Sequence, residues 1–149
     1  MVSRVIPVEP FDLVIFGGTG DLARRKILPV LFRSFSDGQM ENNSRIIGAA
    51  RSDYDDKAYR KFVREALKEF IQDDLEKREV DKFLEQIHYI KIDATGSGGW
   101  SDLAKLLRDK VIRAFYFSVA PSLFGALAER LHDHNCAGPS CRIVVEKPF

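Results

Sequence analysis

The sequence predicts an α/β fold, a doubly wound Rossmann-type parallel sheet with helices on both faces. Short stretches rich in apolar and β-branched residues alternate with longer amphipathic stretches, which is the pattern of repeated strand–helix–strand units. The first apolar stretch runs directly into a turn that contains Gly17, Gly18 and Gly20, and a helical pattern follows. With right-handed crossovers, this arrangement predicts the strand order 3-2-1-4-5.

The elements are expected in alternation along the chain. The predicted strands are residues 12–16, 45–50, 87–93, 111–119 and 141–145. The first predicted helix follows the glycines and ends at residues 37–38. The other predicted helices are residues 55–77, 80–84, 100–108 and 122–132, and all of these segments repeat apolar residues at helical spacing. Pro29 disturbs the first helix because proline lacks the N–H group. Either that helix kinks at Pro29, or residues 22–26 form a short turn and the main helix begins near Pro29.

Length and composition predict one domain over residues 11–149, after a flexible lead-in at residues 1–10. The net charge is +1, so charge offers no argument for binding nucleic acid or an anionic membrane. No apolar run approaches the roughly 20 residues of a membrane span, and no signal peptide is visible. Only two cysteines are present, which favours reduced thiols in a cytoplasmic protein.

The glycine turn is the first candidate site. Residues 18–23 fit the pattern G-x-G-x-x-A, and Gly17 and Gly20 alone fit G-x-x-G. Either pattern lies between a strand and a helix, the position at which dinucleotide-binding domains hold a pyrophosphate. Glycines let the backbone come close to the phosphates, and the N–H groups at the helix start face the anion. The alternative is a tight turn without a ligand. No Gly-Lys-Ser/Thr follows, so a Walker-type phosphate loop is not indicated.

The end of the second strand indicates which coenzyme binds. An acidic residue at this place binds the ribose 2′-hydroxyl of NAD, whereas an arginine accommodates the 2′-phosphate of NADP. The strand ends in Arg51 and Ser52, which favours NADP, although Asp53 is close by. A guanidinium binds a phosphate through two parallel hydrogen bonds. Arg24 and Arg25 offer further positive charge.

Four stretches together closely resemble glucose-6-phosphate 1-dehydrogenases. They are GGTGDLARRKILP at residues 17–29, GAARS at 48–52, FYFSVAPSLF at 115–124 and VVEKPF at 144–149. The resemblance covers the chain from residue 11 onward and implies the coenzyme-binding domain of that family. It implies an oxidoreductase that oxidises D-glucose 6-phosphate to 6-phospho-D-glucono-1,5-lactone with reduction of NADP. This reaction belongs to glucose metabolism, a part of carbohydrate metabolism, and is a step of the pentose phosphate pathway.

The resemblance also implies roles for individual residues. The expected cofactor-binding residues are Gly17, Gly18, Thr19, Gly20, Asp21, Leu22, Arg51, Ser52, Val119, Ala120, Pro121 and Lys147. The first six are expected along the pyrophosphate, Arg51 and Ser52 at the 2′-phosphate, and residues 119–121 near the nicotinamide. Lys147 and Lys26 are also expected to contact the substrate. Many family members have proline where this chain has Ala120.

The catalytic base of the family is a histidine in a second, α+β domain that binds substrate and forms the subunit interface. No such segment occurs in this chain, so we expect no catalytic residue here and no turnover by this polypeptide alone. The full-length protein is expected to be a homodimer or a homotetramer. The alternative is a stand-alone NADP-binding redox sensor without catalytic activity. No metal site is predicted, because the spacing of His132, His134, Cys136 and Cys141 is unlike that of paired zinc ligands.

Overall fold

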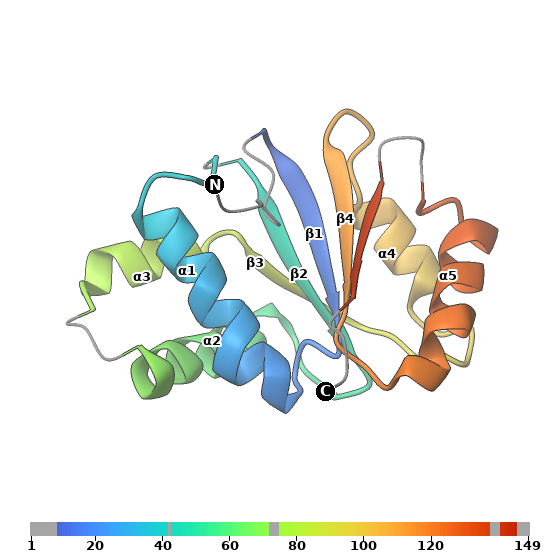
Figure 1. Cartoon of the computed structure of the whole chain (residues 1–149), viewed down its shortest axis with the longest axis horizontal. Coiled ribbons are helices and arrows are strands. Elements are labelled where there is room, and N and C mark those ends of the chain that lie inside the picture. The colour runs from blue at the N-terminus through green and yellow to red at the C-terminus, as the bar shows by residue number, and fades with distance from the viewer. Residues whose placement is uncertain (1–8, 42, 72–74, 138–140, 146–149) are drawn as a thin grey trace.

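The computed structural model describes residues 9–41, 43–71, 75–137 and 141–145. Within these residues the chain forms one parallel sheet in the order β3-β2-β1-β4-β5, as predicted (Figure 1). The strands are β1 (Phe11–Phe16), β2 (Arg45–Ala50), β3 (Ile87–Lys91), β4 (Ile112–Phe117) and β5 (Arg142–Val145). The central strand, β1, is buried along its whole length. The glycine turn that follows it therefore lies at the middle of one sheet edge.

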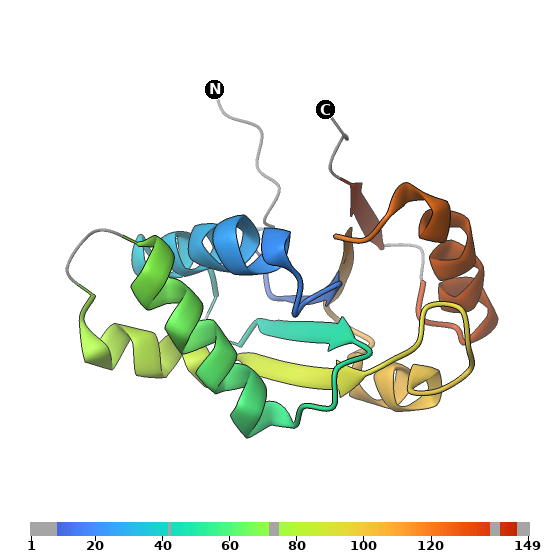
Figure 2. The same cartoon turned by 90° about the horizontal axis from the view of Figure 1, so that it is seen from below.

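Helices cover both faces of the sheet, which confirms the predicted fold class (Figure 2). They are α1 (Leu28–Ser36), α2 (Asp56–Phe70), α3 (Lys77–Leu84), α4 (Trp100–Leu106) and α5 (Phe124–Asp133). Because successive side chains of a strand point to opposite faces, Leu13 and Ile15 pack in the core cluster under α1, α2 and α3. Val14 and Phe16 pack in the second cluster, under α4 and α5.

A π-helical turn precedes the helix that contains Pro29. Residues Ala23–Ile27 form this turn, in which the Leu28 N–H donates to the Ala23 carbonyl, and α1 begins at Leu28. Pro29 thereby occupies the first turn of α1, a position in which proline is common because its fixed φ suits the helix. Of the two arrangements expected from the sequence, the structure has the short turn followed by the main helix.

Some elements end earlier than the sequence predicts. The helix expected over 55–77 ends at Phe70, and Ile71 is already extended. Acidic side chains in the last turn destabilise a helix, and the sequence of the expected continuation contains two of them, at positions 73 and 74. The strand expected over 111–119 ends at Phe117; the Ser118 N–H still donates to the Phe16 carbonyl, and residues 118 and 119 lie beside the glycine turn.

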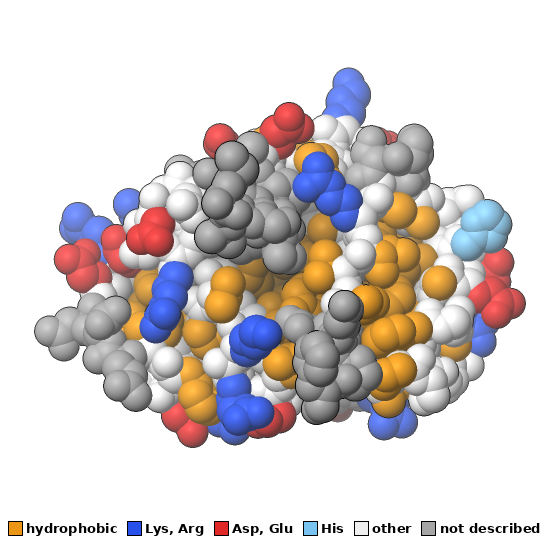
Figure 3. Space-filling model, in the orientation of Figure 1, with side chains coloured by type: hydrophobic (Ala, Val, Ile, Leu, Met, Phe, Trp, Pro, Cys, Tyr) orange, Lys and Arg blue, Asp and Glu red, His pale blue; other side chains and the backbone are white. Residues whose placement is uncertain are grey.

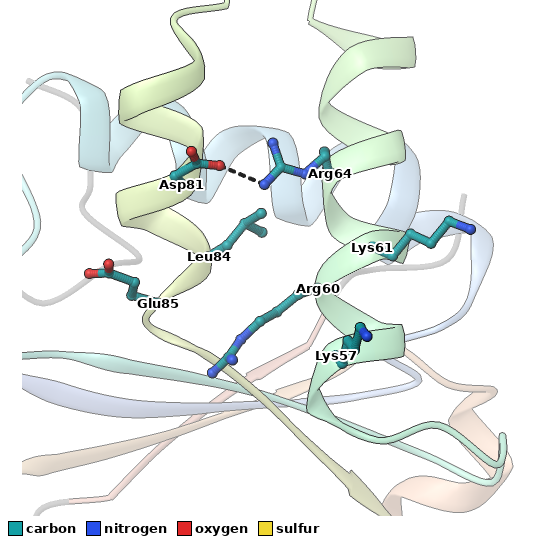
Figure 4. Close-up of a pocket in the computed structure, with 7 residues that line it drawn as sticks. All are labelled: Lys57, Arg60, Lys61, Arg64, Asp81, Leu84 and Glu85. Atoms are coloured by element: carbon teal, nitrogen blue, oxygen red, sulfur yellow. Dashed lines mark hydrogen bonds and ion pairs between the residues drawn. The ribbon is translucent and has the colours of Figure 1, made fainter.

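Side chains of α2 attach this helix to α3 and β3 (Figure 4). The Arg64 guanidinium lies 2.6 Å from the Asp81 carboxylate of α3, and Arg60 Nε donates to the Ile87 carbonyl at 2.9 Å. At the start of α2, the Asp56 carboxylate accepts from the Tyr89 N–H at 2.8 Å and lies 3.4 Å from His88 Nδ1. These contacts hold α2 against α3 and against residues 87–89 of β3.

The edge strand β5 leaves apolar side chains in solvent. Ile143 is 49% exposed and Val145 is 47% exposed. Hydrophobic side chains also gather around β5 and α5 in the space-filling view (Figure 3). Among the described helices, none has both the length and the apolar character needed to cross a membrane.

Candidate nucleotide-binding site

A cleft of ≈ 510 Å³ opens at the carboxyl ends of β1, β2, β3 and β4. It is lined by Gly17, Thr19, Gly20, Ala49, Ala50, Arg51, Ser52, Ile92, Asp93, Thr95, Val119 and Leu123. The chain leaves β1 toward α1 on one face and leaves β4 toward α5 on the other, so the cleft lies where the winding direction reverses. Parallel α/β sheets bind their ligands at such a switch point.

Close approach of backbone atoms explains why the turn after β1 requires glycine. Gly17 has φ +82°, and a Cβ at this residue would lie 2.1 Å from the Ser118 carbonyl oxygen of the neighbouring strand end. The Gly17 and Gly18 N–H groups both donate to the Ala49 carbonyl of β2, at 2.9 and 3.2 Å. The turn is thereby hydrogen-bonded to β2 and lies directly against the end of β4.

The helix start supplies N–H groups for an anion. The Arg24 N–H makes the first helical bond, to the Gly20 carbonyl at 3.1 Å, so the N–H groups of residues 21–23 precede the helical ladder. Unbonded N–H groups at a helix start carry partial positive charge and bind phosphate groups. The site can therefore hold a pyrophosphate through backbone atoms, as the glycine pattern predicts.

Arg51 and Ser52 follow β2 and reach the same cleft. The Ser52 hydroxyl lies 3.0 Å from the Thr19 hydroxyl, which joins the loop after β2 to the glycine turn. The Arg51 side chain is exposed and lines the cleft. A guanidinium and a hydroxyl are thus placed together beside the pyrophosphate position, where they can bind a further phosphate group.

Two carboxylates, those of Asp53 and Asp93, lie near Arg51, and only Asp93 lines the cleft. Asp53 does not line the cleft; its side chain is 96% exposed and lies 3.8 Å from Lys91 Nζ. Asp93, two residues after the end of β3, does line it. Hydrogen bonds from the Thr95 amide and hydroxyl hold the pKa of Asp93 below its usual range, and the nearby Arg51 charge acts in the same direction. Asp93 is therefore an anion beside Arg51 at neutral pH.

The two arginines after the glycine turn are engaged outside the cleft. Arg24 lies 2.7 Å from the Glu69 carboxylate, and its guanidinium carbon stands 4.9 Å from the centre of the Phe70 ring. Arg24 and Arg25 both pair with Asp21, at 3.2 and 2.8 Å. Arg24 thus connects the first helical turn to α2, and both arginines pair with Asp21.

The structure brings only part of the predicted site together. Of the predicted residues, the cleft lining includes Gly17, Thr19, Gly20, Arg51, Ser52 and Val119. Gly18 is buried beneath the turn, Leu22 packs against the core, and Asp21 and Lys26 are exposed. Ala120 and Pro121 begin a short 3₁₀ turn beside the cleft. Lys147 lies outside the described residues, so its predicted roles remain predictions.

Sequence reasoning missed several residues of the cleft. They are Ala49, Ala50, Ile92, Asp93, Thr95 and Leu123. Most of them could have been predicted from their position after a strand, because the carboxyl ends of parallel strands meet at one edge of the sheet and form the binding site there. Asp93 closes the third predicted strand, and a carboxylate at that position could have been assigned to the site.

The chain matches a known protein family over residues 14–149. The family is described as "Glucose-6-phosphate dehydrogenase, NAD binding domain". This chain belongs to that family. It is 46% identical to a glucose-6-phosphate 1-dehydrogenase of Rhizobium meliloti over all of its own length and 31% of the relative's length. A relative of the same name from Gluconobacter oxydans is 41% identical, over 95% of this chain and 30% of the relative.

Solved structures agree with the sequence match. The chain superposes with a TM-score of 0.85 on the crystal structure of glucose-6-phosphate 1-dehydrogenase from Mycobacterium avium, at 31% sequence identity. The superposition covers 96% of this chain and 31% of the Mycobacterium avium chain. A glucose-6-phosphate dehydrogenase in complex with its substrate glucose-6-phosphate gives a TM-score of 0.82 at 29% identity, covering 95% of this chain and 31% of that one. The chain thus spans about 31% of the length of these relatives.

Proposed function

We propose that this chain is the NADP-binding domain of a glucose-6-phosphate dehydrogenase. The full-length enzyme would oxidise D-glucose 6-phosphate to 6-phospho-D-glucono-1,5-lactone and transfer the hydride to NADP. Family membership supports the reaction, and the cleft at the glycine turn supports the coenzyme role. The observation that carries the choice of NADP is the position of Arg51 and Ser52 on the cleft, while Asp53 lies outside its lining.

Each residue group then has a chemical task. The N–H groups at the helix start would bind the pyrophosphate, and the glycines would allow its close approach. The Arg51 guanidinium would bind the 2′-phosphate, which NAD lacks. Asp93 would place a negative charge on the same cleft, near this guanidinium. NADP supplies the hydride acceptor, and the described residues bind and orient it.

Hydride transfer from the sugar also requires a base that takes the proton. We place this histidine, together with the substrate and subunit-interface domain, in the part of the relatives that this chain does not span. The polypeptide alone is accordingly predicted to be inactive. A spectrophotometric assay of NADPH formation from glucose 6-phosphate checks this, and turnover by the pure chain would contradict it.

Thermal unfolding with added coenzyme tests the binding function. A ligand that binds only the folded state stabilises it by RT ln(1 + [L]/Kd), so a tighter ligand raises the midpoint further. We expect NADP to raise the unfolding midpoint more than NAD at equal concentration. Arg51→Ala should lose most of this difference, because a charge-assisted hydrogen bond contributes about 1.5–3 kcal/mol, or roughly 10- to 100-fold in affinity.

Arg78→Ala is the matched control. Arg78 is exposed on α3 and does not line the cleft, so its removal lowers the net charge equally without touching the site. It should leave the difference between NADP and NAD unchanged. If NADP protects the unaltered chain no better than NAD, the coenzyme assignment is wrong. If neither coenzyme protects it, the nucleotide-binding function itself is refuted.

Three further properties remain proposals. They are a cytoplasmic location, a place in the pentose phosphate pathway and assembly of the full-length protein as a homodimer or homotetramer.

A further inference from the structure

Two buried tyrosines lie beneath the loops that form the cleft. Tyr59 of α2 is 0% exposed and Tyr89 of β3 is 7% exposed, and their ring centroids are 5.0 Å apart. The Tyr59 hydroxyl donates to the Gly18 carbonyl at 2.8 Å. The Tyr89 hydroxyl contacts the Ala50 carbonyl at 3.1 Å and the Ser52 carbonyl at 2.7 Å. One tyrosine thus contacts the glycine turn, and the other contacts the loop after β2.

The contacts of Tyr89 determine the path of the loop at residues 50–52. Both carbonyls must converge on one hydroxyl, so the loop curls around it and the Arg51 side chain projects outward. The Ser52 carbonyl also accepts from the Tyr54 N–H at 3.0 Å. The Ser52 hydroxyl lies within hydrogen-bond distance of the Thr19 hydroxyl. The Tyr89 hydroxyl is protonated at neutral pH and can donate a hydrogen bond, and burial raises its pKa further, to about 12.

Tyr59 acts on a different part of the site. Its hydroxyl holds the turn at Gly18, and a Cβ at Gly48 would lie 2.3 Å from its ring. The glycine turn serves the pyrophosphate, which NAD and NADP share. The loop after β2 serves the position at which the two coenzymes differ. The two hydroxyls are therefore expected to affect binding in different ways.

We propose that Tyr89 is a positioning residue for selection of the 2′-phosphate: its hydroxyl holds the loop at residues 50–52 so that Arg51 and Ser52 face the phosphate. This inference rests on the proposed function. Tyr89 does not line the cleft itself and acts through the backbone of the loop. Without the hydroxyl, the loop carbonyls lose their buried donor and Arg51 loses its fixed position.

Calorimetric titration of NADP and of NAD into the unaltered chain and into Tyr89→Phe tests the proposal. Phenylalanine keeps the ring and removes only the hydroxyl. We expect the Kd for NADP to rise about three- to tenfold, in keeping with the net value of one buried hydrogen bond. The Kd for NAD should change by less than about twofold, because the loop makes no phosphate contact with NAD. Tyr59→Phe should raise both Kd values by the same factor.

Tyr54→Phe is the control from the same aromatic cluster. The Tyr54 ring lies 5.6 Å from the Tyr89 ring, the residue is 37% exposed, and no hydrogen bond of its hydroxyl is found among the described residues. Removing this hydroxyl should leave both Kd values unchanged. Equal weakening of NADP and NAD by Tyr89→Phe would mean that the hydroxyl only stabilises the fold, and would overturn the proposal.

The outcomes separate this proposal from the proposed function. If the unaltered chain prefers NADP and Tyr89→Phe keeps the same preference, the positioning role alone is refuted. If the unaltered chain shows no preference for NADP, the coenzyme assignment fails and the positioning role fails with it. Should Tyr89→Phe not fold, the variant Tyr89→difluorotyrosine is compared with the unaltered chain across pH, because its hydroxyl ionises at lower pH. The preference for NADP should then fall as pH rises, and a flat profile would refute the role.

Discussion

Replacing Gly17 with alanine tests the geometry of the turn most directly. Gly17 has φ +82°, and a Cβ there would lie 2.1 Å from the Ser118 carbonyl oxygen and 3.2 Å from Val119 Cγ1. The first neighbour is a backbone atom that follows a buried strand, and the Ser118 N–H donates to the Phe16 carbonyl at 2.9 Å. The oxygen therefore cannot move away without disturbing the pairing of β1 with β4.

The expected cost has two parts. An alanine in the left-handed region costs about 1–2 kcal/mol relative to its usual conformations. Overpacking against atoms that cannot move costs about 1–3 kcal/mol. Gly17→Ala should therefore lower the free energy of unfolding by about 2–5 kcal/mol, a large part of the roughly 5–15 kcal/mol of a typical domain.

Gly38→Ala separates these two parts. Gly38 has φ +74°, but no atom lies within 4 Å of the position of its Cβ. This variant should show only the conformational cost of about 1–2 kcal/mol. Urea unfolding of the two variants, followed by circular dichroism, measures the difference. If Gly17→Ala unfolds at the same urea concentration as Gly38→Ala, the steric argument for this turn is refuted.

Other predictions concern buried polar groups. Arg108→Met should lower the free energy of unfolding by about 3–5 kcal/mol, since the fully buried Asp12 carboxylate then loses the guanidinium 2.7 Å away. The double variant Asp12→Leu/Arg108→Met should recover most of this loss in urea unfolding, and no recovery would contradict the pairing. Burial raises the pKa of Tyr89 from 10.0 to about 12, so its stabilisation is complete below pH 10.0 and is lost as pH rises through about 12. Stability measured across that range should fall less steeply for Tyr89→Phe, and identical profiles would refute this.

The coenzyme site illustrates how far local patterns reach. The glycine turn and Arg51 stand out in the sequence because each lies directly after a strand, and both are found on the cleft. The sequence offers Asp53 as the carboxylate near Arg51, but Asp93 takes this place. Asp53 is close to Arg51 along the chain, whereas Asp93 is brought there by the pairing of β2 with β3.

The fold class, the strand order and the distribution of helices were predictable because they depend on local patterns and general rules. Apolar runs mark buried strands, helical spacing marks amphipathic helices, and right-handed crossovers then leave one natural order. The partners of buried polar groups were not predictable in this way. Asp12 meets Arg108 across 96 residues, and Tyr59 meets Gly18 across 41. Such groups are brought together only when the strands pair and the helices pack on the sheet. The tertiary structure alone therefore decides which hydroxyl is hydrogen-bonded to which loop.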